Sequence, residues 1–471
     1  MRTWTWPVLL AAGLMVAACR EEDVPPEIVE ATQSGAASLD EGVTLRIVAR
    51  DPRGSDLFFS WKTDIGTLGP KHNTATTSEV HWTAPRCGPE GRSPAVTATV
   101  LNMAGLSTST TFTLPPVPCP KPSSVELGPH YSLMVFDDGT VWGWGFNTEG
   151  ILGEQGLNQR VGPVKLRGLS GVKSVFTQGN FSVAVREDGT VWGWGSNVYR
   201  VFGDENVSAR YLTPVRMTEL QDVKAVTFWM GRMLALREDG TVWAWGSGVV
   251  NDGLAPDSRT PVQLSGLDHV KALACQGVHV LALREDGTVW AWGNNLNGQL
   301  GDGTTTNRST PAQVSGLDHV KVVAANRDGS MVLREDGTVW AWGHNSEGQL
   351  GDGTLNNRST PAQVNGLDHV KAIAMGDYNA LVLREDGTMW GWGQNQFNIL
   401  ADGTTTPRLT PVRVAGSFDG VRAVSYRNIS HHFLLLRDDG TVWGWGYNDE
   451  GELMPCGTTE LIAYPAQCRL P

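Results

Sequence analysis

Seven copies of a Trp-x-Trp-Gly segment recur along this chain at intervals close to fifty residues. Successive copies are 50, 51, 47, 50, 50 and 53 residues apart. A fixed period of this length predicts a solenoid or a propeller, because each repeat buries its apolar face only against its neighbours. The pairs use 14 of the 19 tryptophans, so the aromatic content reflects architecture. They are Trp142/Trp144, Trp192/Trp194, Trp243/Trp245, Trp290/Trp292, Trp340/Trp342, Trp390/Trp392 and Trp443/Trp445.

Each repeat contains four short runs rich in β-branched residues. In the fifth copy, they begin near Val320, Ser330, Thr338 and Thr360. This pattern, with turn residues between the runs, predicts four strands. Asp-Gly joins the second and third runs of every copy, and we expect a two-residue type I′ turn there, in which both residues need φ > 0. The pairs are 138/139, 188/189, 239/240, 286/287, 336/337, 386/387 and 439/440.

The Trp-x-Trp strand indicates how neighbouring sheets pack. Side chains alternate along a strand, so Trp340 and Trp342 share one face and Ala341 lies on the other. The intervening residue is Gly or Ala in every copy, which lets one sheet's tryptophans lie against the small residues of the next. A buried indole removes roughly 150–250 Å² from water, worth about 4–6 kcal/mol gross. Four-stranded sheets repeated in this way favour a β-propeller, and seven repeats predict seven blades.

The repeat resembles the regulator of chromosome condensation repeat family, whose members form seven-bladed propellers. The matching segments include Gly277–Gly287, Val289–Gly293 and Asn297–Gly303, and the resemblance covers residues 123–471. The WD repeat has a similar period, but its Gly-His and Trp-Asp signatures do not occur at the repeat positions. The resemblance implies an all-β fold. Some eukaryotic members of the family exchange guanine nucleotide on a small nuclear GTPase and bind chromatin, so the resemblance also raises these two activities for this chain.

Charge argues against those two activities for this chain. The formal net charge is −12 and the sequence pI is about 5.3. No run of Lys and Arg provides the positive surface that nucleic-acid binding requires. We therefore expect no nucleic-acid partner, and guanine-nucleotide exchange is disfavoured despite the resemblance.

The N-terminus predicts export and attachment to a membrane. Arg2 precedes an apolar stretch from Val8 to Val16, and Ala17-Ala18-Cys19 follows. A charged start, a short apolar core and small residues predict a signal peptide, here residues 1–18. Cysteine after Ala-Ala resembles the bacterial lipobox, which makes Cys19 the expected lipidated residue. An ordinary signal peptide with a coincidental cysteine is the alternative. No later run approaches the ~20 apolar residues of a membrane span, so we expect membrane contact through the lipid anchor only, at the bacterial outer membrane or cell surface.

A separate domain is predicted between the tether, residues 19–26, and the propeller. Residues 27–115 contain short alternating runs such as Val43–Ala49, which predict a small β-sandwich. Scattered motifs resemble Ig-like domains of bacterial surface proteins, such as polycystic-kidney-disease-type modules. A Pro-rich linker, residues 116–122, follows. The simplest role of the sandwich is that of a spacer that lifts a monomeric propeller from the membrane.

An oxidising compartment permits disulfides. Cys456 and Cys468 lie in the last repeat, where a bridge would hold the closing segment beside the seventh sheet. Cys87 and Cys119 form a second candidate pair between the sandwich and the linker. Cys275 lies in an apolar run and is expected to be a buried free thiol. The spacing does not fix the connectivity.

No motif predicts catalysis. The chain lacks Gly-x-Ser-x-Gly, His-Glu-x-x-His and phosphate-loop patterns, and the carboxylates of the hairpins recur because the turn recurs. We therefore expect no enzyme activity and no cofactor. His269, His319 and His369 occupy one position of a repeated connection. A ring of metal ligands is one reading of them, but we favour solvated turns and no metal.

Binding residues are expected where the repeats differ from one another. Seven residues before each turn aspartate, the family often carries His, whereas this chain varies. Aromatic residues and Arg on variable loops suit an interface with a protein partner, in a scaffold, assembly or inhibitor role. Glycan or cell-wall binding is the alternative, with the aromatic residues as stacking platforms, and sequence drift at surface positions would also explain the variation. The candidates are Tyr131, Phe181, Trp229, Arg232, His279, Arg327, Asp328, Tyr378, Asn379, His431 and His432.

Overall fold

The computed structural model divides the chain into two compact units, Met1–Pro120 and Lys121–Pro471. Strands dominate both units, and the one helical turn among the described residues is a 3-10 turn, η1 (Gln396–Asn398). None of the described helices could cross a membrane. The structure describes residues 24–34, 42–84, 92–116, 120–153, 161–203, 208–217, 220–229, 231–246, 258–416, 418–427, 432–448, 451, 453, 456–457 and 461–468. The predicted signal peptide and Cys19 lie outside these residues.

The N-terminal unit consists of two antiparallel sheets around one core. Trp61 and Trp82 are both buried in this core, with Val43, Leu45 and other apolar side chains of both sheets. The alternating burial along β2 is the pattern of a strand with one covered face. One sheet has the order β1 (Glu27–Gln33), β2 (Val43–Arg50), β5 (Thr77–Thr83), β4 (Thr67–Asn73), and the other β3 (Leu57–Thr63), β6 (Ala95–Asn102), β7 (Ser107–Thr113).

The C-terminal unit contains seven antiparallel four-stranded sheets among its described residues, numbered here 1 to 7 in chain order. Each sheet is formed by four consecutive strands, so all of its strands come from one contiguous segment. β8 begins at Pro122, within the predicted linker. Sheets 1 to 3 comprise β8 (Pro122–Leu127), β9 (Tyr131–Phe136), β10 (Val141–Gly145), β11 (Val161–Lys165); β12 (Val172–Gln178), β13 (Phe181–Arg186), β14 (Val191–Ser196), β15 (Arg210–Arg216); and β16 (Val223–Trp229), β17 (Arg232–Arg237), β18 (Val242–Gly246), β19 (Ser258–Gln263).

The remaining four sheets repeat this order without a change of topology. They comprise β20 (Val270–Ala274), β21 (His279–Arg284), β22 (Val289–Gly293), β23 (Arg308–Gln313); β24 (Val320–Ala325), β25 (Gly329–Arg334), β26 (Val339–Gly343), β27 (Arg358–Gln363); β28 (Val370–Met375), β29 (Asn379–Arg384), β30 (Met389–Gly393), β31 (Arg408–Arg413); and β32 (Val421–Arg427), β33 (His432–Arg437), β34 (Val442–Tyr447), β35 (Leu461–Gln467).

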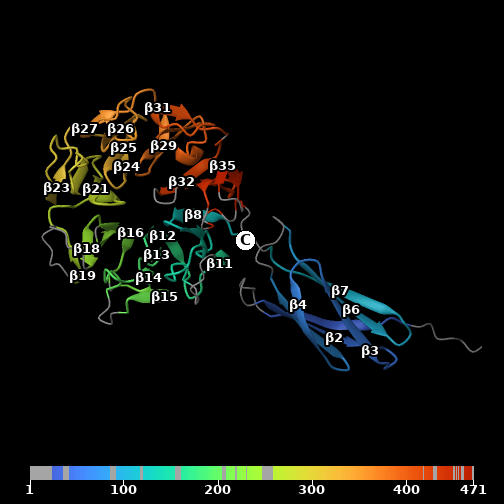
Figure 1. The fold of residues 1–471 in the computed structure, drawn as a ribbon. Helices are drawn as coiled ribbons and strands as arrows, with labels where there is room; N and C mark the ends of the chain where they lie inside the picture. The colour runs from blue at the N-terminus through green and yellow to red at the C-terminus, as the bar shows by residue number, and fades with distance from the viewer. Residues whose placement is uncertain are drawn as a thin grey trace, which may run out of the picture. The chain divides into compact units, whose positions relative to one another are not determined.

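The first strands of the sheets lie around a common centre (Figure 1). Each contacts the first strand of the next sheet, and β32 contacts β8. A buried cluster joins Val125 and Trp144 of sheet 1 to Leu434 and Trp445 of sheet 7. Arg422 Nη2 donates to the Ser123 carbonyl at 2.5 Å. Sequence left open which strand is shared where the first and last sheets meet; the described strands show that the two sheets pack together without sharing one.

The hairpins differ from the predicted two-residue turn. In sheet 2, Arg186 N donates to Thr190 O at 3.0 Å and Gly189 N donates to Arg186 O at 2.9 Å. Gly189 has φ +72°, but Asp188 is not among the residues with positive φ. The loop is therefore a three-residue Glu-Asp-Gly turn that ends in a left-handed glycine, not a type I′ Asp-Gly turn. Asp188 Oδ1 accepts from Thr190 N and Oγ1, which explains the recurring Asp-Gly-Thr.

The two tryptophans of each segment have different roles. The second is fully buried and reaches the preceding sheet; Trp342 Nε1, for example, donates to the Gln299 carbonyl at 2.8 Å. Gly301 permits this approach, because a Cβ there would lie 2.8 Å from Trp342 Nε1 and its φ is +70°. The first tryptophan is half-buried, and the Arg334 guanidinium lies 5.7 Å from the centre of the Trp340 ring. Each sheet is thus attached to the preceding one through its second tryptophan.

Cys456 and Cys468 form a disulfide, as the sequence predicted. The bridge ties the segment after β34 to the end of β35. Cys275 is a buried free thiol. The other predicted pair, Cys87 and Cys119, lies outside the described residues.

Candidate binding face of the propeller

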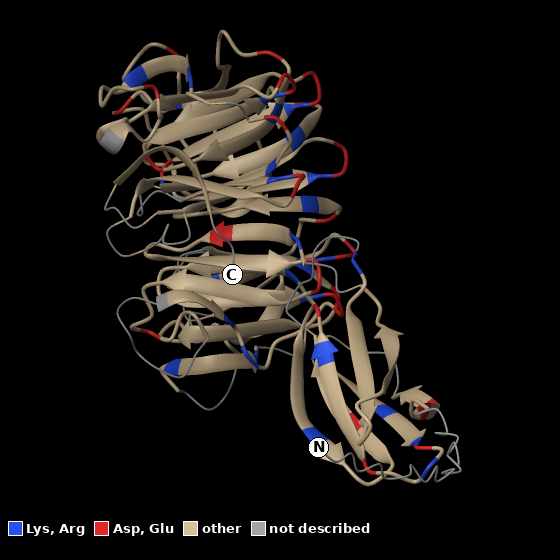
Figure 2. Cartoon of the chain, turned by 90° about the vertical axis from the view of Figure 1, so that its right-hand side faces the viewer, with Lys and Arg blue, Asp and Glu red and all other residues tan. Residues whose placement is uncertain are grey.

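The two ends of the sheets differ in chemistry. We call one end the loop face: it carries the connections between first and second strands and between third and fourth strands, such as 326–328 and 344–357 of sheet 5. The opposite end, the turn face, carries the hairpins and the connections between sheets. All seven hairpins contribute Glu-Asp or Asp-Asp, and Figure 2 shows acidic residues gathered in loops along one side of the propeller unit.

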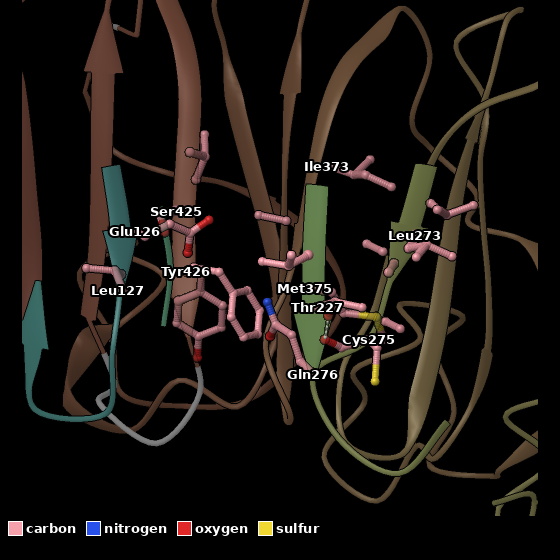
Figure 3. Close-up of a pocket in the computed structure, with 18 residues that line it drawn as sticks. Glu126, Leu127, Thr227, Leu273, Cys275, Gln276, Ile373, Met375, Ser425 and Tyr426 are labelled. Atoms are coloured by element: carbon pink, nitrogen blue, oxygen red, sulfur yellow. Dashed lines mark hydrogen bonds between the residues drawn. The ribbon is translucent and has the colours of Figure 1, made fainter. Parts of the chain in front are cut away.

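A cavity of about 290 Å³ lies on the central axis and is lined by the first strands of all seven sheets. Most of the side chains around it are apolar, including Leu273, Ile373 and Met375, and Glu126 is the one charged residue among them. Figure 3 shows Tyr426 and Gln276 at one end of the cavity. That end belongs to the loop face, because both residues stand at the end of a first strand.

Tyr426 is a rigid wall of this cavity. Its ring stacks on Phe433 with a centroid distance of 4.0 Å and packs against Gly376, where a Cβ would collide with it. Burial raises the pKa of the Tyr426 hydroxyl far above its ordinary value. The phenol therefore stays neutral and supplies shape without charge.

Hydrogen bonds between adjacent first strands stiffen the loop-face mouth of the cavity. Thr177 Oγ1 donates to Leu127 O at 2.5 Å, and Thr227 Oγ1 donates to Cys275 O at 2.9 Å. Asn326 Nδ2 donates to the Gly376 carbonyl in the same way. A preformed surface of this kind loses little conformational entropy on binding.

Most of the predicted binding positions are buried, and the expectation that they contact a partner is wrong. His279 Nε2 lies 2.8 Å from Ser330 Oγ, and burial lowers the pKa of His279 to about 4. Tyr131 Oη donates to Phe181 O at 2.9 Å. The buried candidates are Tyr131, Phe181, Arg232, His279, Asn379 and His432.

The reason lies in the packing of the second strands. Every candidate at the repeated position begins a second strand, and in β9 all six residues are buried. Such a strand has a neighbouring sheet over each face, so alternation along it no longer separates core from solvent. The side chain of Trp229, although the residue ends β16, and the whole of His431 lie outside the described residues.

Three predicted residues do reach the loop face. Arg327 is 65 % exposed, and its backbone N donates to Asp377 Oδ1 at 3.0 Å. Asp328 accepts from the buried Gln299 amide at 3.5 Å. Tyr378 is half-buried, with its ring edge towards His344 at 6.5 Å. Arg327 and Asp328 belong to sheet 5 and Tyr378 to sheet 6, so the three residues come from two adjacent sheets.

Sequence reasoning missed the exposed apolar residues of the longer loop-face connections. Leu296 is 68 % exposed, and Val198, Tyr199 and Leu355 are also exposed. They stand in polar, Gly-rich segments, where an apolar side chain has no core to join. That contrast is the signal by which they could have been found. Apolar side chains exposed together on one face are typical of interaction surfaces.

The turn face offers no metal site among the described residues, where no cluster of His, Cys, Asp and Glu has the required arrangement. His269, His319 and His369 have exposed side chains and left-handed φ values of 53°, 51° and 50°. Gly171 and Gly420 occupy the same position between sheets with φ of 62° and 68°. The position therefore requires a left-handed residue in a solvated turn.

Repeated four-stranded sheets around an axis, with a rigid loop face, define the C-terminal unit as a β-propeller. Family models agree with this assignment. One described as an RCC1-like domain matches residues 249–469, and two described as Regulator of chromosome condensation (RCC1) repeats match residues 138–185 and 172–200. The unit is therefore similar in sequence to RCC1-type repeats and has the fold of a β-propeller. No curated protein matches the sequence.

Solved structures of the same fold include two of RCC1 from yeast and one of a human protein. Yeast RCC1 (Prp20) bound to Kap60 has a TM-score of 0.60 at 23% identity over 70% of this chain and 83% of that chain. Prp20p from Saccharomyces cerevisiae has 0.61 at 22% over 72% and 87%. Human WBSCR16 has 0.60 at 22% over 71% and 94%. At these identities the likeness is one of fold.

Proposed function

We propose that this chain is a non-enzymatic binding protein whose loop face holds a protein partner. The observation that carries the proposal is the exposure of Tyr199, Leu296, Leu355 and Arg327 in connections of the loop face. Tyr and Arg are among the residues that dominate binding energy at protein interfaces. We further propose that the seven sheets form seven blades of a closed ring, which would hold these loops in fixed relative positions.

The solved relatives support a protein as the partner. Yeast RCC1 is described bound to Kap60, and Prp20p is described by its binding to Gsp1p and histones. These partners are not carried over, because the formal net charge of −12 disfavours chromatin. What is carried over is the use of a propeller for protein binding.

The test is affinity capture from an envelope extract of the source cells. The bait is the full mature chain, and the test variant is Tyr199→Ser with Leu296→Ser. Both side chains are exposed, so the variant should fold. The control is Glu285→Gln with Glu335→Gln on the turn face. A protein retained by wild type and control but lost with the test variant supports the proposal, once direct binding of the purified partner shows the same order. Equal retention by all three baits would contradict it.

We also propose that the chain is an exported lipoprotein with Cys19 as its lipidated residue and the N-terminal unit as an Ig-like spacer. The support is Ala17-Ala18-Cys19 after an apolar stretch, together with two short sheets around one core. Mass spectrometry of the mature N-terminus tests this. A diacylglyceryl-modified Cys19 is expected, and the Cys19→Ala protein should leave the membrane fraction. An unmodified Cys19 within the mature chain would refute the anchor.

A further inference from the structure

Sheet 7 contains a second cavity, distinct from the axial one. It has a volume of about 470 Å³ and lies between the connection that enters sheet 7 and strands β33, β34 and β35. That connection belongs to the turn face, at the opposite end of the sheets from the proposed protein-binding loops. Pockets for small ligands span roughly 300–1,000 Å³ and combine apolar walls with a few polar groups. This cavity meets both conditions.

The chain departs from its own repeat twice at this place. Tyr464 precedes the proline of β35, and the other six sheets have Thr or Gly there, such as Thr360 in sheet 5. The connection from Val414 to Val421 is also one residue longer than the connection from Val314 to Val320. The extra space and the extra aromatic ring therefore occur together, and the disulfide of sheet 7 fixes the end of β35.

Aromatic side chains form the walls of the pocket. Tyr464 is 55 % exposed, Trp443 is half-buried, and Phe418 is buried behind them. An exposed tyrosine in a pocket leaves apolar area that a ligand can cover. A flat ring with apolar C–H groups on its face gains most from such walls.

Two charged groups complete the pocket. The Arg437 guanidinium lies 4.9 Å from the centre of the Trp443 ring, and Asp419 is exposed at the side of the connection. A carboxylate accepts hydrogen bonds and a guanidinium donates them, so together they match a ligand that carries several hydroxyls. The Asp419 carboxylate repels phosphate, and a purely aliphatic ligand would gain nothing from either charge.

From this combination we propose that the sheet 7 pocket binds a hexopyranose unit of a surface glycan. The ring would stack on Tyr464 and Trp443, and its hydroxyls would bond to Asp419 and Arg437. The site is separate from the loop face, so glycan and protein binding do not compete for the same residues.

The test uses saturation-transfer NMR and calorimetry on the full mature chain. The probes are the methyl glycosides of glucose, galactose, mannose and N-acetylglucosamine, together with chitobiose. At least one should bind saturably. Tyr464→Thr, which installs the residue of the neighbouring sheets, should weaken binding at least about tenfold, or 1.4 kcal/mol. Tyr464→Phe should retain binding, because the stacking face remains.

Controls separate this proposal from the first one. Asp419→Asn should weaken binding without removing the aromatic walls, and Tyr199→Ser on the loop face should leave it unchanged. Circular dichroism and Tm establish that each variant is folded. No saturable binding by any probe would overturn the proposal, and so would equal affinity of the Tyr464→Thr and wild-type chains. A loss of binding only in Tyr199→Ser would also overturn it.

Discussion

Sheets 4 to 6 and sheet 7 hold the connection after their third strand with different interactions. Each must hold a long connection after its third strand, and in each a buried Asn anchors it. In sheet 5, Asn345 Oδ1 accepts from Leu350 N at 3.0 Å, and its Nδ2 donates to Asp352 Oδ1 at 3.2 Å. In sheet 7, Asn448 accepts from Leu453 N at 2.7 Å, but its Nδ2 bonds to Gly457 O.

The difference is what completes the loop. Asp352 accepts three further bonds, from Thr354 N, Thr354 Oγ1 and Arg358 Nη1. Sheets 4 and 6 place Asp302 and Asp402 in the same way. Sheet 7 has the disulfide in place of this aspartate network. The repeats thus keep the buried Asn that accepts from the connection. The interactions that complete the connection differ: hydrogen bonds of an aspartate in sheets 4 to 6 and a disulfide in sheet 7. The disulfide occurs in sheet 7, the sheet that packs against sheet 1.

Loss of the disulfide should have the largest effect. Closing a loop with a sequence separation of 12 residues is worth about 3 kcal/mol through the unfolded chain. We expect Cys456→Ser with Cys468→Ser to lower the free energy of unfolding by about this amount, measured by urea titration. A matched reduction of the wild-type protein should reproduce the loss. An unchanged urea midpoint in both proteins would show that the disulfide does not stabilise the propeller.

Removal of the polar anchor should come next. Asn345→Ala leaves the buried Leu350 N without its acceptor and should cost about 2 kcal/mol. Asn448→Ala should cost less, on the order of 1 kcal/mol, because the bridge still holds that loop. Thermal unfolding of both variants checks the order, and the exposed Ser346→Ala serves as control. Equal losses would contradict the division between polar and covalent fastening.

Acid should weaken sheet 4 through His279. Burial lowers the pKa of this residue from 6.5 to about 4, so the unfolded chain binds the proton more readily than the folded chain. The free energy of unfolding is therefore unaffected by His279 above pH 6.5 and falls as the pH is lowered towards 4. The expected loss is about 1–2 kcal/mol between pH 7 and pH 5. His279→Asn installs the residue that sheet 6 has at the same position. We expect its unfolding curves to depend less on pH than those of wild type over this range; identical pH dependence would assign the effect elsewhere.

Tyr464→Thr should have the smallest effect on stability. The side chain is exposed, and Thr occupies the equivalent position in five other sheets, so the free energy of unfolding should change by no more than about 0.5 kcal/mol. The reciprocal Thr360→Tyr should be equally mild, and without the longer connection it should create no sugar site. Differential scanning calorimetry measures both changes. A large loss in Tyr464→Thr would show that the tyrosine belongs to the core.

The repeat, its four strands and the Cys456–Cys468 bridge could be predicted from sequence, because period and alternation record local structure. The turn type was wrong, since Asp-Gly alone does not reveal that Glu187 belongs to the turn. The candidate site was wrong at Tyr131 and His279 for a different reason. Variation among repeats does not imply exposure, because a strand packed on both faces varies with its two neighbours. At the sheet 7 pocket, Tyr464 and the longer connection after Val414 stand out in the sequence, but only the fold shows that they meet at one cavity.

Because each sheet comes from one contiguous segment, the sheets are completed one after another during synthesis. The apolar face of sheet 1, however, is covered only when the last sheets have been made. Sheet 1 is complete once residue 165 has been made, yet Val125, Leu127 and Trp144 are covered by side chains of sheets 6 and 7. Chains emerge at about 5–20 residues per second, so this apolar face would wait on the order of ten seconds or more for its cover. The first sheet therefore stays without its cover until the last sheets have been made, which under the proposed export keeps the chain in the unfolded state that transport requires.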